Sequence, residues 1–249
     1  MSASRPPLRT LQVVRTMRRT PRMQRITLGG AELAGFPAGC EGAHIKLLFP
    51  DDAGRTHVRT YTVAGLDALA LELDVDIVLH GDGGPASRWA SRACAGAAIG
   101  LIGPGGPALY RPHAQRFLLL GDSSSYALVH GVMGKLPAGA EGDVLMLVPH
   151  VEEILPLPLR DRMRVQWLLE REDAWLDALA SLPRPSAEVS VTLAGESAQV
   201  IAVRDFLVHQ WQVRRDMMYA VPYWKRDVDE DAYHDERHRI MDAFEVEAA

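Results

Sequence analysis

The sequence predicts a two-domain protein, with an N-terminal antiparallel β-barrel and a C-terminal α/β domain built on a parallel sheet. Up to residue 112, short strand-like segments follow one another between turn signals, and no long helical pattern separates them. After residue 112, short apolar runs alternate with helical patterns, as in parallel sheets covered on both faces. We expect a barrel over residues 9–112, an α/β domain over 113–226 and an acidic C-terminal helix over 227–249.

The composition is that of an ordinary globular protein, with 249 residues, 47% of them apolar, 24% charged, and a net charge of −5. The acidic balance disfavours a nucleic-acid partner, although arginines gather within residues 15–25. The two cysteines lack paired spacing and the nine histidines lack metal-ligand spacing, so we expect reduced thiols and no metal site. No apolar run approaches the roughly 20 residues that cross a membrane. We therefore expect a cytoplasmic protein without membrane insertion.

The barrel strands are indicated by short extended patterns between turn residues. Residues 11–28 carry apolar anchors at β-like spacing, and glycines and prolines mark the turns that follow. Residues 44–50 (HIKLLFP) form another expected strand, and residues 51–54 form a turn. Extended structure resumes over residues 58–63, and residues 99–103 are expected to close the barrel.

The clearest strand of the barrel runs from residue 71 to residue 79. Leucine, valine and isoleucine occupy every second position, with acidic residues between several of them, which is the period of a strand with one buried face. The glycine-rich turn 80–84 follows, and Pro85 is a favoured first helical residue. A helix start of this kind presents unpaired N–H groups that can hold a phosphate, and Ser87 can add a hydroxyl. The alternative is an ordinary tight turn before a surface helix.

A second chemical feature is the segment RTYT at residues 59–62. On a strand, Arg59 and Tyr61 share one face, which places a phosphate-binding guanidinium beside a ring that can stack on a flat cofactor. Thr62 can offer its hydroxyl or its backbone N–H to a ring heteroatom. The alternative is a packing tyrosine beside a solvated arginine. Together with the glycine turn, the segment favours a site for a dinucleotide with a planar head.

The second half of the chain alternates buried strands with helices, which implies a ligand crevice at the carboxyl ends of the strands. Asp122 follows one apolar run, and Gly195 and Glu196 follow another, so we expect a nicotinamide nucleotide at these residues. The expected strands lie at 117–120, 144–148, 165–169 and 189–193, and the expected helices lie at 124–136, 152–155, 171–182 and 198–211.

Several motifs in this order resemble those of siderophore-interacting proteins, which are FAD-dependent ferric-siderophore reductases of the ferredoxin-reductase superfamily. The resemblance covers roughly residues 10 to 245. The motifs that carry it are RTYT (59–62), DVDIVLHGDGGPASRWA (74–90), GPGG (103–106), GD (121–122), AGE (194–196) and YWKRDVDEDAYHDERH (223–238).

The resemblance implies an FAD-binding, ferredoxin-reductase-like barrel and a C-terminal NAD(P)H-binding domain. It implies an oxidoreductase that reduces siderophore-bound iron(III) to iron(II) in the cytoplasm, with electrons from NAD(P)H or a reduced ferredoxin and with no side chain as catalytic acid or base. We expect a monomer. Lys46 corresponds to a family lysine where the chelate would approach. The residues expected to bind the cofactors are Arg59, Tyr61, Thr62, His80, Gly83, Gly84, Pro85, Ala86, Ser87, Asp122, Gly195 and Glu196.

The chain departs from the family pattern at three places. Gly105 stands where the family usually has an arginine, residues 123–128 differ from the usual ETALPA, and Thr192 replaces a tryptophan. These departures keep two alternatives open, namely reduction by a ferredoxin-type partner and a flavin or siderophore binder without turnover.

A hydrolase is an alternative from another class. The Gly121–Ser123 segment resembles the nucleophile block of GDS-type esterases, with Ser123 as nucleophile and His234 as base. This alternative leaves the first half of the chain unexplained. We expect the tail, residues 224–247, to be a packing helix that buries Tyr233 and pairs Asp235 with Arg239.

Overall fold

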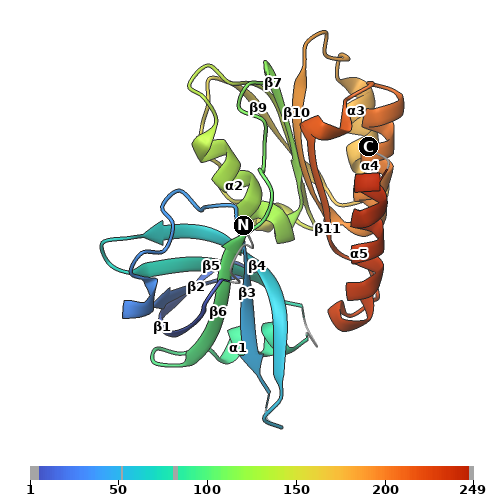
Figure 1. Cartoon of the computed structure of the whole chain (residues 1–249). Helices are drawn as coiled ribbons and strands as arrows, with labels where there is room; N and C mark the ends of the chain where they lie inside the picture. The colour runs from blue at the N-terminus through green and yellow to red at the C-terminus, as the bar shows by residue number, and fades with distance from the viewer. Residues whose placement is uncertain (1–5, 52, 81–83, 247–249) are drawn as a thin grey trace. The chain divides into compact units, whose positions relative to one another are not determined.

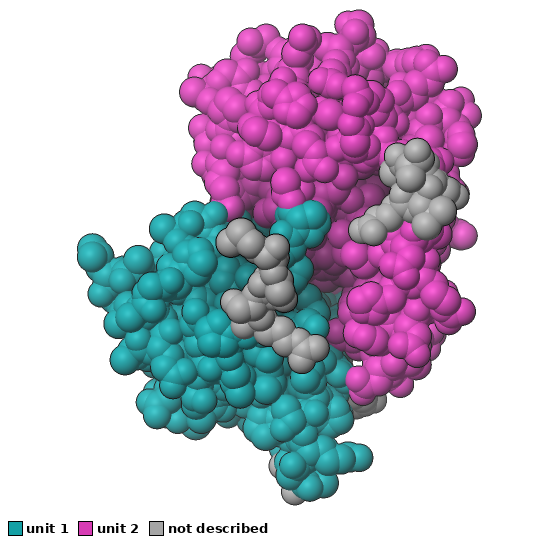
Figure 2. Space-filling model, in the orientation of Figure 1, with its two compact units in different colours: residues 1–107 teal, residues 108–249 magenta. Residues whose placement is uncertain are grey.

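The computed structural model describes residues 6–51, 53–80 and 84–246, with side chains described up to residue 244. The chain divides into two compact units, residues 1–107 and residues 108–249 (Figures 1 and 2). Each unit has its own secondary structure and its own core, and each is described separately below.

Unit 1 is a closed barrel in which every strand pair is antiparallel, with the order β1-β2-β5-β4-β3-β6 (Figure 1). The predicted antiparallel barrel is therefore confirmed. Helix α1 (Pro85–Arg92) lies between β5 and β6 in the sequence and begins at the predicted proline. The strands are β1 (Leu8–Thr20), β2 (Met23–Gly29), β3 (His44–Pro50), β4 (Thr56–Asp67), β5 (Glu72–Val78) and β6 (Ala98–Gly105), and a short 3₁₀ turn covers Ala31–Leu33.

Strand β5 shows why this sequence forms a barrel. Leu73, Val75 and Ile77 are fully buried in the barrel core, as the alternation predicts. Their acidic neighbours point to the other face, where they meet the arginine-rich first strands. Alternation of this kind fixes the register, because a slip by one residue would turn carboxylates into the core.

The arginines near the N-terminus are used to pair with these carboxylates. Arg25 forks onto Asp76 with contacts of 2.8 and 2.7 Å and also reaches Asp74 at 3.2 Å. Arg19 reaches the same Asp76 at 3.2 Å. The Asp76 side chain is only 3% exposed, so this network closes the face between β1, β2 and β5 at a site with little solvent screening.

Unit 2 is a five-stranded parallel sheet with the order β11-β10-β7-β8-β9, as the β/α alternation predicts. Helices α3 and α4 pack together against the buried strands of the sheet (Figure 1). The strands are β7 (Arg116–Gly121), β8 (Glu141–Val148), β9 (Arg162–Leu169), β10 (Val189–Glu196) and β11 (Met218–Trp224). The helices are α2 (Tyr126–Lys135), α3 (Ala174–Ser181), α4 (Ser197–His209) and α5 (Glu230–Val246), with 3₁₀ turns at Ser123–Ser125, Val151–Glu153 and Arg215–Met217.

The sequence reading of the tail needs correction. Trp224 ends strand β11, whereas we expected it to begin the terminal helix. The sequence did not predict this strand because it contains Pro222 and is only partly buried, which weakens the strand pattern. An edge strand tolerates both features. In α5, Arg239 donates to the backbone carbonyl of Asp235 at 3.3 Å, so their contact runs through the main chain.

The buried face of α5 is anchored by Tyr233, which is 1% exposed. Its hydroxyl donates to the Ser197 hydroxyl at 2.8 Å, which ties α5 to the start of α4. None of the described helices is long and apolar enough to cross a lipid bilayer.

The ion network on the barrel predicts a large stability difference between two similar substitutions. Asp76→Asn removes the nearly buried carboxylate that Arg19 and Arg25 share and leaves Arg25 only its longer contact with Asp74, so we expect a loss of about 3 kcal/mol in the free energy of unfolding. Glu72→Gln removes the partner of Arg15, whose side chain is 58% exposed, and should cost less than about 1 kcal/mol. Urea unfolding followed by circular dichroism measures both. Equal losses in the two variants would contradict the buried network.

Candidate functional site

The expected flavin-binding side chains of the barrel lie on β4. Arg59 is 7% exposed and donates from Nη1 to the Val58 carbonyl at 3.0 Å. Tyr61 lies two residues further along the same face and packs against the barrel core. Thr62, which is 6% exposed, pairs in register with His44 of β3. The guanidinium and the aromatic ring are therefore held on one rigid strand.

A chain of aromatic contacts links this strand to helix α1. The Tyr61 ring meets the edge of Phe49 with centroids 5.8 Å apart, and Phe49 meets Trp89 at 5.4 Å. Both contacts are edge-to-face, a favourable geometry for aromatic pairs. Phe49 is fully buried on β3, so the core of the barrel fixes α1 relative to the tyrosine.

The residues on either side of the glycine turn are hydrogen bonded to each other. The His80 backbone N–H donates to the Ser87 hydroxyl at 3.1 Å, and the same hydroxyl donates to the His80 carbonyl at 3.1 Å. This tie holds the end of β5 against the first turn of α1. The expected contact residue Gly83 lies outside the described residues.

The N-terminus of α1 fits an anionic ligand. Gly84 is the N-cap, Pro85 is the first helical residue, and no side chain caps the N–H groups. A Cβ built on Gly84 would meet no atom within 4 Å, so open space adjoins the cap. The following Ala86 is buried and packs the helix onto the barrel. Backbone N–H groups at a helix start that no N-cap side chain occupies are a suitable place for phosphate oxygens.

The place of the missing family arginine is occupied by a histidine ring. A Cβ built on Gly105 would lie 3.1 Å from His44 Nε2, and one built on Gly106 would lie 2.7 Å from His44 Nδ1. A side chain at either position would therefore displace the imidazole. Lys46, two residues after His44, is exposed on β3 and faces Thr60 in register. His44 and Lys46 thus supply the basic groups of this part of β3.

In unit 2, Asp122 follows β7 and is already saturated with hydrogen bonds. Trp224 donates its indole N–H to Oδ2 at 2.7 Å, while Ser124 donates to Oδ1 from its backbone N–H at 2.8 Å and from its hydroxyl at 2.6 Å. Burial raises the pKa of Asp122, and these donors oppose the shift. A Cβ built on Gly195 would lie 2.7 Å from Asp122 Oδ2, so glycine is needed for this close approach.

Glu196 holds the start of α4. It is 7% exposed, and its carboxylate accepts the Gln199 N–H at 3.1 Å and the Arg226 N–H at 3.3 Å. Strands β7 and β10 are adjacent and parallel, so Asp122, Gly195 and Glu196 meet at one edge of the sheet. Their side chains organise this edge, because the carboxylates are committed to the loops that surround them.

The sequence did not predict a ligand-binding role for two polar atoms at this edge. Within the described part of the chain, the buried side-chain oxygens that lack a hydrogen-bond partner are Ser123 Oγ and Gln199 Oε1. Ser123 was noticed only as a possible nucleophile. Gln199 lies inside a helical pattern, and no local signal distinguishes it from a surface glutamine.

The esterase alternative lacks its required contact. Ser123 Oγ has no hydrogen-bond partner, although a serine nucleophile needs a base within reach. The proposed base, His234, packs against His238 on α5 with ring centroids 4.6 Å apart. The described geometry therefore offers no nucleophile–base pair at these residues.

Comparisons with known proteins agree with this geometry. A model of the siderophore-interacting FAD-binding domain matches residues 12–58 and 52–108, and a model of the siderophore-interacting protein family matches residues 114–227. The chain is 35% identical over 258 residues to ferric vibriobactin reductase ViuB of Vibrio cholerae, covering 94% of this chain and 95% of ViuB.

Solved structures show the same relationship. The siderophore-interacting protein SipS from Aeromonas hydrophila matches with a TM-score of 0.86 and 34% identity, over 95% of this chain and 99% of SipS. A ferredoxin reductase of carbazole 1,9a-dioxygenase shares the fold, with a TM-score of 0.73 and 16% identity over 90% of this chain and 71% of that one. The expected ferredoxin-reductase-like fold is confirmed. With both units matched and with ViuB and SipS aligned over nearly their whole lengths, the chain belongs to the siderophore-interacting protein family.

Proposed function

We propose that this protein is an FAD-dependent oxidoreductase that reduces siderophore-bound iron(III) to iron(II) and so releases iron in the cytoplasm. The observation that carries the proposal is the barrel site, where Arg59 and Tyr61 on β4 are fixed relative to the uncapped start of α1. Membership of the siderophore-interacting family and the likeness to a ferric vibriobactin reductase support it.

The residues present fit FAD. Arg59 supplies a guanidinium for phosphate oxygens, and the start of α1 supplies the backbone N–H groups of Gly84, Ala86 and Ser87, while Pro85 has no N–H and fixes the direction of the first turn. Tyr61 offers the ring against which the flavin stacks, and Thr62 offers a polar contact to it. Ser87 and the backbone of His80 tie the end of β5 to the first turn of α1. Bound FAD supplies the redox chemistry, because it can accept an electron pair and release the electrons singly.

Basic groups on β3 favour an anionic iron chelate as substrate. Lys46 is exposed, and the ring of His44 lies beside Gly105 and Gly106. Hard oxygen ligands hold iron(II) less strongly than iron(III), so reduction releases the metal without proton transfer from a side chain. The protein's task is to bind the chelate and to orient it.

The edge of unit 2 at Asp122 and Gly195 supports a nicotinamide nucleotide as electron donor, since open α/β sheets bind ligands at the carboxyl ends of the strands where the strand order reverses, here between β7 and β10. A reduced ferredoxin is the other donor class that we consider. A non-catalytic flavin and siderophore binder is the second candidate function, favoured by the loss of the arginine at Gly105. We propose that the protein acts as a monomer.

An anaerobic absorbance experiment tests the proposal. NADH, NADPH or reduced ferredoxin is added in turn to the FAD-loaded protein, followed by a ferric siderophore. We expect one donor to bleach the flavin and the chelate to restore its colour. A protein that binds both FAD and the chelate but never reoxidises would support the binding role, and a protein that binds no FAD would contradict both.

The phosphate contact of Arg59 predicts a loss of cofactor affinity. We expect Arg59→Ala to weaken FAD binding by about 10- to 100-fold, because a hydrogen bond to a charged group contributes about 1.5–3 kcal/mol. Flavin fluorescence titration measures the affinity. Arg15→Ala is the matched control, since Arg15 is 58% exposed and pairs with Glu72 on the outer face of the barrel. Unchanged flavin occupancy in Arg59→Ala would place the phosphates elsewhere.

The exposed Lys46 predicts charge-dependent substrate binding. For an anionic ferric chelate, Lys46→Gln should raise KM by about fivefold, since one exposed charge pair contributes about 1 kcal/mol. For a neutral ferric chelate the same variant should behave as the wild type, and raised salt should reduce the difference between chelates. Steady-state kinetics with both chelates measure this. A similar rise in KM for both chelates would show that Lys46 does not distinguish an anionic chelate from a neutral one.

A further inference from the structure

Both unpartnered buried oxygens of the described residues lie at the same edge of unit 2. Ser123 Oγ follows β7 and Gln199 Oε1 lies in the first turn of α4, directly after β10. Gln199 is only 8% exposed, so its amide oxygen has little access to bulk water. Native proteins rarely leave such groups unpaired, and their presence at a ligand-binding edge points to a ligand that completes their hydrogen bonds.

We propose that this edge binds a nicotinamide dinucleotide without a 2′-phosphate, with Ser123 and Gln199 as ligand-binding groups and Glu152 as the residue that selects NADH over NADPH. The inference rests on the proposed function, because it takes the nucleotide to be the electron donor. One NADH gives up a hydride and supplies two electrons. The balance is two iron(III) reduced to two iron(II), with NAD⁺ and one proton left over.

The basic side chains that follow β9 and β11 each pair with a carboxylate. After β9, Arg171 pairs with Asp177 at 2.5 Å, and after β11, Arg226 pairs with Glu170 at 3.2 Å. Lys225 pairs with Glu236 at 2.6 Å. Within the described residues, no lysine or arginine directly follows β7, β8 or β10. A 2′-phosphate, which carries close to two negative charges, would therefore have to compete with a carboxylate for each of these basic groups.

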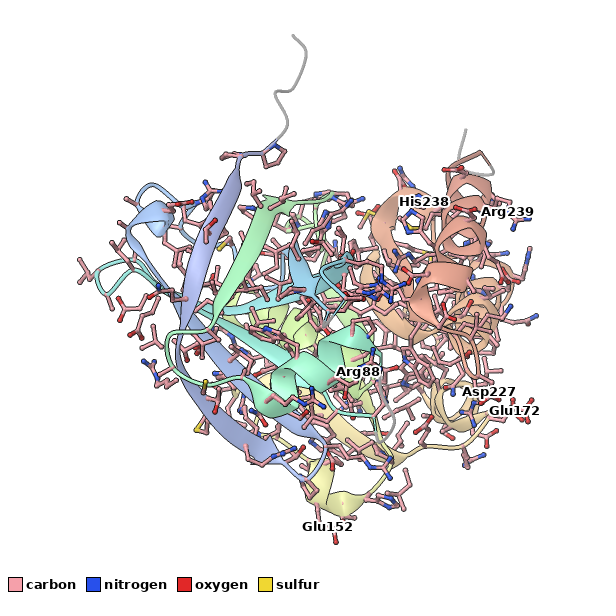
Figure 3. All side chains as sticks on the ribbon, turned by 90° about the horizontal axis from the view of Figure 1, so that it is seen from below. Arg88, Glu152, Glu172, Asp227, His238 and Arg239 are labelled. Atoms are coloured by element: carbon pink, nitrogen blue, oxygen red, sulfur yellow. The ribbon has the colours of Figure 1, made fainter. Side chains whose placement is uncertain are left out.

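Acidic groups dominate the same edge. Glu152 is exposed in the 3₁₀ turn that follows β8, the strand beside β7, and Figure 3 shows it projecting from the lower edge of the view. Glu172 and Asp227, labelled in the same figure, are exposed after β9 and β11. In dinucleotide-binding sheets an acidic side chain after the second strand accepts a hydrogen bond from the free ribose 2′-hydroxyl, and it repels a phosphate in that place. Glu152 has the position for this role.

Calorimetric titration of the oxidised, FAD-loaded protein with NAD⁺ and with NADP⁺ tests the inference without turnover. We expect NAD⁺ to bind at least about tenfold tighter than NADP⁺. Glu152→Arg should abolish or invert this preference. Asp161→Arg is the matched control, because Asp161 is exposed and lies at the opposite end of the sheet, immediately before β9. It should leave the preference unchanged.

A second pair of variants tests the unpartnered oxygens. Gln199→Leu and Ser123→Ala should each weaken NAD⁺ binding by about tenfold while leaving the thermal midpoint equal or higher, because neither oxygen bonds within the protein. A structural role would instead lower the midpoint. A variant that binds NAD⁺ as tightly as the wild type, or that loses affinity together with a lowered thermal midpoint, would overturn the assignment of these groups.

Three outcomes would overturn the inference: tighter or equal binding of NADP⁺, an unchanged preference in Glu152→Arg, or no binding of either nucleotide. The proposed function is tested separately by photoreducing the flavin under anaerobic conditions and adding the ferric siderophore. If the photoreduced protein reduces the chelate but the oxidised protein binds neither nucleotide, the nucleotide is not the electron donor, and the proposed reductase function stands. Failure of that reduction would overturn the reductase.

Discussion

The proposed flavin site depends on one residue of the barrel core, Phe49, which contacts both Tyr61 and Trp89. Phosphate binding and ring stacking come from different elements, a strand and a helix start, and neither is useful unless their separation is fixed. The buried Phe49 fixes it through edge-to-face packing, and the tie between His80 and Ser87 fixes the near end of the turn. Preorganisation of this kind reduces the entropy lost when a cofactor binds.

In unit 2, buried carboxylates hold the loops at the carboxyl ends of the strands. Asp122 and Glu196 lie at the edge that we propose for the nucleotide, yet Asp122 already accepts hydrogen bonds from the Ser124 backbone and the Trp224 indole, and Glu196 accepts them from backbone N–H groups. An uncompensated buried carboxylate would be costly, and these donors offset the cost while fixing the loops after β7 and β10. The groups left over for a ligand are consequently neutral ones, the hydroxyl of Ser123 and the amide of Gln199.

Much of the fold could be predicted because its signals are local. Alternation in β5, the proline at the start of α1 and the apolar runs of β7 and β10 each follow from neighbouring residues. Strand β11 could not, because an edge strand with a proline carries a weak pattern. Nor could the packing of His44 against Gly105, which joins residues of two strands, or the orphan amide of Gln199, which depends on what surrounds it in space. Site chemistry that arises from long-range contacts has no local signature.

The distribution of charge connects the two proposals. In a chain of net charge −5, the exposed Lys46 on the barrel is suited to an anionic chelate, whereas the carboxyl edge of unit 2 has its basic groups neutralised by ion pairs. In the two proposals, electrostatic attraction by Lys46 favours a negatively charged chelate at the barrel, whereas the acidic edge of unit 2 disfavours a negatively charged phosphate on the nucleotide ribose. Because the neutral Ser123 and Gln199 supply hydrogen bonds without adding charge, the edge can hold a dinucleotide while discriminating against one extra phosphate.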